Sequence, residues 1–152
     1  MPYASFEDGY LPSHLTSSIF AQWARVPAPN PCRKFHISSD IASAQAIADT
    51  CLPILRAHNL HHKVVESEVY LRKQAIGPQA GKFITIYTPV GGSGMPKVID
   101  DLAEALAALE DSGQAHPCPS IPRFRPSGHV FAEAPRDERM FIYGGFVCNP
   151  YD

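Results

Sequence analysis

The stretch Lys82-Phe-Ile-Thr-Ile-Tyr-Thr88 is the clearest β-strand in this sequence, and it decides the fold class. β-branched and aromatic side chains fill it, and these residue types favour strands because they pack well on a pleated surface. Weaker strand patterns lie upstream at residues 33–38 and 62–66, and two more are expected at residues 129–132 and 140–147. We therefore expect a sheet built around residues 82–88.

Helical patterns alternate with the first of these strands. Residues 14–26, 41–59 and 96–111 carry apolar side chains at helical spacing. Asp40 is a candidate N-cap for the second helix, and Pro53 should kink or split it. The apolar positions that define the first and third helices are Leu15, Ile19, Phe20 and Trp23, and Ile99, Leu102, Leu106 and Leu109.

The order of these elements predicts an α+β fold. Strands and helices alternate at first, but the chain ends in two strands, which favours a mixed or mainly antiparallel sheet with helices packed on one face. A length of 152 residues suits a single compact domain. Within it, residues 1–30 are expected to be an N-terminal helix with a proline-rich lead-in, and residues 31–152 the main body of the domain. Loops are expected at residues 77–81, 90–94 and 116–128.

Composition narrows the class of protein. The chain is 45% hydrophobic and 18% charged, which is typical of a globular protein and not of a disordered one. A formal charge of −2 argues against a dedicated nucleic-acid binder. No stretch of about 18 apolar residues predicts a membrane span, and no basic segment leads into an apolar run as in a secretory signal. We expect a cytoplasmic protein, with secretion as an effector left open.

Cysteine and histidine spacing gives no metal motif. The four cysteines lack any Cys-x-x-Cys pair and are expected to be free thiols. His61-His62 and His116-Pro-Cys118 have no second pair at zinc-ligand spacing, so structural or surface roles are favoured for them. The cysteines are Cys32, Cys51, Cys118 and Cys148.

The short strand at residues 33–38 is the first candidate for chemistry. Alternate side chains of a strand share a face, so Lys34, His36 and Ser38 should lie on one side and Phe35 and Ile37 on the other. The apolar pair belongs against the helices. The polar trio then belongs either to a solvated edge strand or to a site.

Further polar positions lie elsewhere in the chain. Lys63 occupies the strand expected at residues 62–66. Arg123 and Arg125 flank an aromatic residue in a proline-rich loop, where two guanidinium groups could grip a phosphate bidentately. Tyr87 and Lys82 lie at opposite ends of the strongest strand and should point to opposite faces. Each of these residues is equally compatible with an ordinary surface or loop role.

Taken in order, these segments resemble a known family. Residues 34–38 (Lys-Phe-His-Ile-Ser), 62–64 and 83–87 are similar to segments of the OspF/SpvC-type phosphothreonine lyase effectors. The second half also resembles the lyase domain of class III/IV lanthipeptide synthetases, through residues 81–87, Arg123 and the closing Tyr-Gly-Gly-Phe of residues 143–146. The matches span about residues 30–147.

The resemblance implies a lyase that eliminates phosphate from phosphothreonine or phosphoserine and leaves a dehydroamino acid. Lys63 would be the general base that removes the Cα proton, and His36 the general acid that protonates the departing phosphate. Lys34 and Arg123 would bind the phosphate, with Tyr87 and Arg125 as further members. No metal or organic cofactor is implied. The implied partner is a phosphorylated peptide or protein, with a separate kinase and cyclase as further candidates.

The sequence departs from the effector pattern at one position before the central strand. The effectors place an arginine there, whereas this chain offers Gln79. Arg72, Lys73 or Lys82 are possible substitutes, so Lys82 joins the candidate phosphate ligands. Substrate identity, a precursor peptide or a host protein, does not transfer with the resemblance.

Three other functions remain open from the sequence. A 2H-type phosphoesterase would use His36-Ile-Ser38 as one His-x-Ser/Thr motif, but the second candidate, His129-Val-Phe131, lacks the hydroxyl. A non-catalytic module that binds phosphopeptides or leader peptides would keep the basic pocket without turnover. In a structural or chaperone-like protein the basic strand would simply be solvated.

Overall fold

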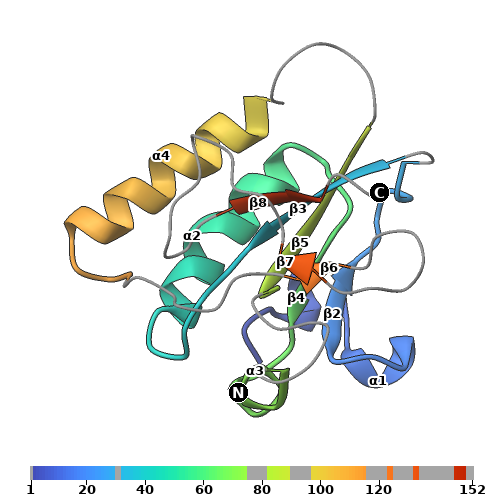
Figure 1. Ribbon diagram of the computed structural model, residues 1–152. Helices are drawn as coiled ribbons and strands as arrows, with labels where there is room; N and C mark the ends of the chain where they lie inside the picture. The colour runs from blue at the N-terminus through green and yellow to red at the C-terminus, as the bar shows by residue number, and fades with distance from the viewer. Residues whose placement is uncertain are drawn as a thin grey trace.

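A six-stranded antiparallel sheet forms the centre of the protein (Figure 1). The computed structural model describes residues 2–29, 32–74, 82–89, 97–115, 123–124, 132–133 and 146–149. In spatial order the strands are β1 (Tyr10–Leu11), β2 (Phe20–Trp23), β4 (His62–Val65), β5 (Ile84–Pro89), β3 (Cys32–Ile37) and β8 (Phe146–Asn149). The expected α+β fold is confirmed, and β5 is a central strand, as the sequence predicts.

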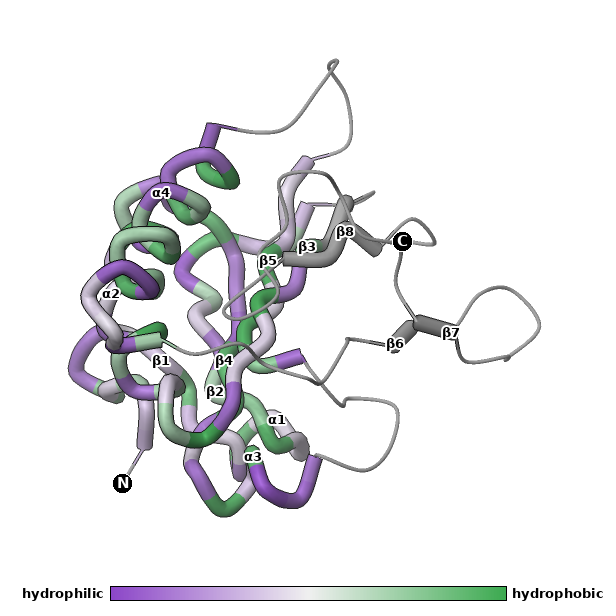
Figure 2. Tube along the Cα trace, turned by 60° about the vertical axis from the view of Figure 1, so that its left-hand side comes forward, coloured by the Kyte–Doolittle hydropathy of each residue, from purple (hydrophilic) through white to green (hydrophobic). Residues whose placement is uncertain are grey.

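Two long helices cover one side of this sheet. Helices α2 (Ala44–Ala57) and α4 (Lys97–Asp111) lie along the same side in both views (Figures 1 and 2). The apolar stripe expected on residues 96–111 is buried in α4. The sheet residues beneath the two helices are also fully or almost fully buried. Each such side chain contributes about 1.5–3 kcal/mol to folding. The core between sheet and helices includes Phe35, Ile37, Val64, Ile84, Ile86, Ile47, Leu55, Leu102 and Leu106.

Helix α2 is shorter than the sequence predicts and is not split. Pro53 lies within it, exposed at the surface, and the helix continues on both sides of that residue. Ser43 occupies the N-cap position in place of Asp40. The Asp40 carboxylate instead accepts a hydrogen bond of 2.8 Å from the Ser43 amide, one turn before the helix begins. Asp40 therefore organises the turn that leads into α2.

The helix expected over residues 14–26 is wrong. Helix α1 (Ser13–Thr16) has only four residues, and Ser17 ends it in the left-handed conformation, with φ of 52°. Leu15, part of the expected apolar stripe, is 62% exposed. The chain then forms β2, which pairs with β4 along its full length. Backbone pairing in the sheet therefore overrides the apparent helical period.

The N-terminal residues are turn-rich, as expected, but they lead into a short strand that joins the sheet. A 3₁₀ turn (Phe6–Asp8) precedes β1, which pairs with β2. Tyr3 and Tyr10 are buried in the main core. The first 30 residues therefore supply two strands of the same sheet that carries the candidate site.

The remaining elements are short. Helix α3 (Glu68–Gln74) fills the stretch between β4 and β5 that showed no clear pattern, and strand β6 (Arg123–Phe124) pairs with β7 (Ala132–Glu133). Arg123 is thus on a strand, not in the loop expected there. Strands β7 and β8 lie near the two strands expected at the C-terminus, with shifted bounds. The loops expected at residues 77–81 and 90–94 lie outside the described residues. None of the helices in the described part of the chain combines the length and hydrophobicity needed to cross a membrane.

Candidate functional site

Four polar residues from four neighbouring strands form one row across the sheet, which we call the polar row. Gln22 pairs with Lys63, Lys63 with Thr85, and Thr85 with His36. Cross-strand partners in an antiparallel sheet share a face. The sheet register therefore brings the expected base, Lys63, and the expected acid, His36, to one face, on either side of Thr85.

This face is the one opposite helices α2 and α4. On the other face, the Arg56 guanidinium of α2 donates a hydrogen bond of 3.1 Å to the Tyr10 hydroxyl of β1. Tyr10 belongs to the row of Trp23 and His62, whose side chains contact one another. Because strand residues alternate, Lys63 lies on the face opposite to its neighbour His62.

The alternation predicted for β3 is confirmed. Phe35 and Ile37 are completely buried on the helix side of the sheet. His36 pairs with Thr85, and Lys34 pairs with Tyr87, two residues further along β5. Lys34 and His36 therefore occupy positions on the same face.

His36 is held by the central residue of the polar row. Its Nδ1 lies 3.1 Å from the Thr85 hydroxyl oxygen, and both residues are only 2% exposed. A buried hydrogen bond of this kind fixes the orientation of the imidazole ring. Nε2, the other ring nitrogen of His36, is buried as well.

Lys63 lies against an aromatic ring. Its ammonium nitrogen is 4.2 Å from the centroid of the Phe20 ring, within the range of a cation–π interaction. Lys63 is half-buried, whereas Phe20 is 4% exposed. The lysine thus combines partial access with a defined aromatic contact.

A second row of ring-bearing residues runs beside the polar row. The rings of His61 and Tyr87 meet edge to face, with centroids 5.0 Å apart. His61 Nδ1 lies 3.0 Å from the Val26 carbonyl oxygen and must donate to it, so Nε2 accepts from the Gln22 amide at 2.9 Å. These bonds fix the orientation of the His61 ring and hold Gln22 beside Lys63. Tyr87, half-buried, faces the Lys34 position across β3 and β5.

The remaining candidate ligands come from other parts of the chain. Lys82 precedes β5, is 9% exposed, and its carbonyl accepts a hydrogen bond from the Gln74 side chain of α3. It therefore lies at the end of β5 away from Tyr87. Arg123 is on β6, paired with Glu133 of β7. Arg125 lies outside the described residues.

The possible substitutes for the missing arginine have other contacts or fall outside the description. Arg72 forms an exposed ion pair of 3.5 Å with Glu68 within α3, and the Lys73 ammonium lies 5.7 Å from the Tyr70 ring. Gln79, the second half-motif at residues 129–131 and the cysteine–histidine pair at residues 116–118 are outside the described residues. These contacts assign Arg72 and Lys73 to the surface of α3.

His62 is part of the core and not of a metal site. Its Nδ1 donates to the Leu60 carbonyl at 2.7 Å, its Nε2 accepts from the Tyr10 hydroxyl at 2.7 Å, and its ring stacks on Trp23. Burial lowers the pKa of His62 from 6.5 to about 4, and the nearby Arg56 guanidinium also disfavours the charged ring. In the part of the chain that the structure describes, no group of three metal-ligating side chains is present. The structural role favoured for the His61-His62 pair is consistent with these contacts.

Cys51 behaves as the sequence predicts. It is a free thiol, fully buried in α2, and burial raises its pKa to about 12. A thiol with such a pKa is neutral and unreactive at physiological pH. Cys51 is therefore a core residue.

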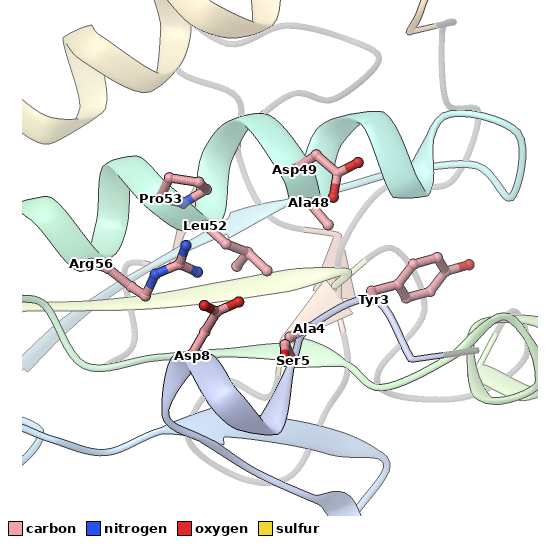
Figure 3. Close-up of a pocket in the computed structure, with 9 residues that line it drawn as sticks. All are labelled: Tyr3, Ala4, Ser5, Asp8, Ala48, Asp49, Leu52, Pro53 and Arg56. Carbon is pink, nitrogen blue, oxygen red and sulfur yellow. The ribbon is translucent and has the colours of Figure 1, made fainter.

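A small cavity lies on the helix side of the sheet, away from the polar row (Figure 3). Its volume is about 100 Å³, and it lies between α2 and the N-terminal segment. Figure 3 shows the Arg56 guanidinium and the Asp8 carboxylate turned toward each other across it. No residue predicted for the site lines this cavity. Its lining consists of Tyr3, Ala4, Ser5, Asp8, Ala48, Asp49, Leu52, Pro53 and Arg56.

Sequence reasoning missed several residues on the face of the sheet that carries the polar row. Thr85 shares the alternation of Tyr87 in the strongest strand, and that parity was sufficient to place it on the same face. Gln22 and Phe20 were hidden because their segment was interpreted as a helix. His61 was expected to have a structural or surface role, and its contact with Tyr87 depends on the register of β4 against β5.

Most of the chain matches one known protein family. The model of the RamC N-terminal domain matches residues 8–121, three quarters of the chain, and includes β1 to α4 with the whole polar row. Among curated proteins, none matches the chain. The chain belongs to the family of RamC N-terminal domains.

Proposed function

We propose that this protein is a metal-independent phosphothreonine/phosphoserine lyase, in which Lys63 is the general base and His36 the general acid. The observation that carries the proposal is the polar row itself. Lys63, the proposed base, and His36, the proposed acid, lie on either side of Thr85 on one face of the sheet. The Lys34 and Tyr87 positions lie in the adjacent row.

The proposed reaction is a β-elimination. Lys63 takes the Cα proton, and the electron pair of the C–H bond becomes the second bond between Cα and Cβ. The Cβ–O bond breaks, and the phosphate leaves with its electron pair while His36 donates a proton to it. The products are a dehydroamino acid, inorganic phosphate and an enzyme whose proton has moved from His36 to Lys63.

The residue types suit these steps. A lysine acts as a base only when neutral, and nearby cations or desolvation favour the neutral form. A protonated imidazole is a suitable acid near neutral pH. His36 would donate through Nε2, because Nδ1 lies against Thr85. Lys34 and Arg123, with Tyr87, Arg125 and Lys82 as further candidates, would hold the phosphate dianion.

Family membership supports a role in peptide modification, without specifying the reaction. The RamC N-terminal domain links the chain to lanthipeptide-type biosynthesis. A dehydroamino acid is the product that the sequence resemblance implies for such an enzyme. The proposed substrate is therefore a phosphorylated peptide, delivered in the cytoplasm by a separate kinase and passed on to a cyclase.

A phosphothreonine peptide pool with a trapping thiol tests the proposal. Elimination removes the elements of phosphoric acid and leaves an alkene that the thiol adds to, as mass spectrometry would detect. Hydrolysis would instead leave a hydroxyl and support a phosphoesterase. Binding of the peptide without any change in mass would support a phosphopeptide-binding module.

A further inference from the structure

The ring of Phe20 lies beside the proposed base, Lys63. The Lys63 ammonium lies 4.2 Å from the centroid of this ring. We infer that Phe20 is a positioning residue that holds Lys63 in its charged, non-basic form in the resting site. The inference rests on the proposed function only for the catalytic role of Lys63.

The physical basis is the charge distribution of the aromatic ring. The face of a phenyl ring carries partial negative charge and attracts a cation, whereas a neutral amine gains no comparable attraction. The contact therefore stabilises the ammonium form of Lys63 selectively. Phe20 is 4% exposed, but Lys63 is only half-buried, so water screens this interaction in part.

The ring is fixed by its place in the sheet. Phe20 pairs with Val65 across β2 and β4, one diagonal step from the pair formed by Gln22 and Lys63. The Gln22 amide nitrogen is bonded to His61, which is itself anchored on the Val26 carbonyl. Phe20 and Gln22 are therefore held in place beside Lys63. The lysine side chain must move if its contact with the Phe20 ring is to break.

Within the part of the chain that the structure describes, ionisable groups also lie on the elements next to Lys63. The Glu66 carboxylate, just beyond β4, is bonded to the Ser13 amide. The ionisable residues at positions on the face of Lys63 are His61 before β4, Tyr87 on β5, and His36 and Lys34 on β3.

This contact has a consequence for catalysis. A lysine held as an ammonium ion cannot accept the Cα proton, so Lys63 must leave the ring before it acts as a base. A phosphate dianion bound on the same face would also favour the ammonium form, so its arrival alone does not make Lys63 a base. The Phe20 contact would thus raise the pH at which Lys63 can accept the Cα proton.

The titration of Lys63 tests the inference without any substrate. Full-length protein is labelled with trace acetic anhydride across a range of pH, and mass spectrometry of the Lys63 peptide gives its titration midpoint. We expect the midpoint to fall by about 0.5–1.5 pH units in Phe20→Leu, and to stay near the wild-type value in Phe20→Tyr, which keeps the ring. Exposed Lys97 is the internal control. Phe20→Met carries the same expectation if Phe20→Leu does not fold.

An unchanged or raised midpoint in the folded leucine or methionine variant would overturn the inference. If the protein eliminates phosphate, the acidic limb of its kcat/KM profile should move to lower pH by the same amount. A shifted midpoint in a protein that never eliminates phosphate would support the Phe20 contact while rejecting the lyase proposal. The experiments can therefore reject the role of Phe20 and the lyase proposal independently of each other.

Discussion

Lys63 and His36 are both direct cross-strand partners of Thr85, one on each side of it. Neighbouring strands lie about 4.8 Å apart, so the backbones of the base and the acid are roughly 10 Å apart. Long side chains on the same face can approach a substrate from two sides across that distance. This arrangement suits a reaction that removes a proton at Cα and delivers one to the oxygen leaving the adjacent carbon.

Replacing Lys63 with Ala should abolish turnover but largely preserve phosphopeptide binding. A general base acts mainly in the transition state, so its loss should lower the elimination rate by about 10²–10⁴-fold. Calorimetric titration gives the binding constant, and stopped elimination assays give the rate. Lys97→Ala on the outer surface of α4 is the matched control and should behave as wild type. Near-normal elimination by Lys63→Ala would leave the proposed mechanism without a base.

Thr85→Val should impair both stability and rate, whereas Thr85→Ser should have little effect on either. Valine keeps the volume but removes the hydroxyl that contacts buried His36 Nδ1. Removing the partner of a buried polar group costs about 1–3 kcal/mol of stability. Loss of this hydrogen bond to His36 should lower the elimination rate by about tenfold. Urea denaturation and the elimination rate measure the two effects, and equal behaviour of the valine and serine variants would contradict this role.

Stability should fall as the pH drops from about 6.5 to 4 because of His62. The folded-state pKa of His62 is lowered to about 4, while the unfolded chain titrates near 6.5. Between these values the unfolded state binds a proton that the folded state does not, so acidification favours unfolding, by up to about 3 kcal/mol. Below pH 4 both states bind the proton and this contribution stops changing. Above pH 6.5 neither state binds it.

Urea denaturation at pH 7 and pH 4.5 measures the effect. His62→Gln should be less stable at pH 7 but should lose less stability on acidification than wild type. His14→Gln is the matched control, because His14 is exposed on α1. An equal loss of stability in wild type and His62→Gln would show that another group causes the acid sensitivity.

Arg123→Ala should weaken phosphopeptide binding as well as turnover. A residue that binds the phosphate stabilises the ground state and the transition state alike. Charge-assisted hydrogen bonds contribute about 1.5–3 kcal/mol, so the dissociation constant should rise by about 10- to 100-fold. Arg72→Ala, on the exposed side of α3, serves as the control. Unchanged affinity in Arg123→Ala would remove this residue from the phosphate site.

The strands of the sheet centre were predictable from sequence because their signals are local. Residues 82–88 combine β-branched and aromatic side chains, and the alternation of residues 34–38 places His36 opposite its neighbours. The amphipathic period of α4 was equally clear, and its stripe is buried. In each case the pattern within one segment is sufficient to identify the element.

The N-terminal strand could not be predicted in this way. Phe20 and Trp23 are three residues apart, a spacing that fits one face of a helix, yet in β2 they lie on opposite faces of the sheet. What makes this segment a strand is its pairing with β4, about forty residues away in the sequence. The aromatic contact of Lys63 was hidden for the same reason, because it depends on the register between those two strands.

The most direct test of the lyase assignment is elimination from a phosphothreonine peptide with hydrogen or deuterium at Cα. If the protein is a lyase, we expect a product that has lost the elements of phosphoric acid and reacts with a thiol. We also expect a slower single-turnover rate for the deuterated peptide, because Lys63 removes that atom as the Cβ–O bond breaks. A product that keeps the Cα deuterium and has gained a hydroxyl, or no product from a peptide that binds, would contradict the lyase assignment.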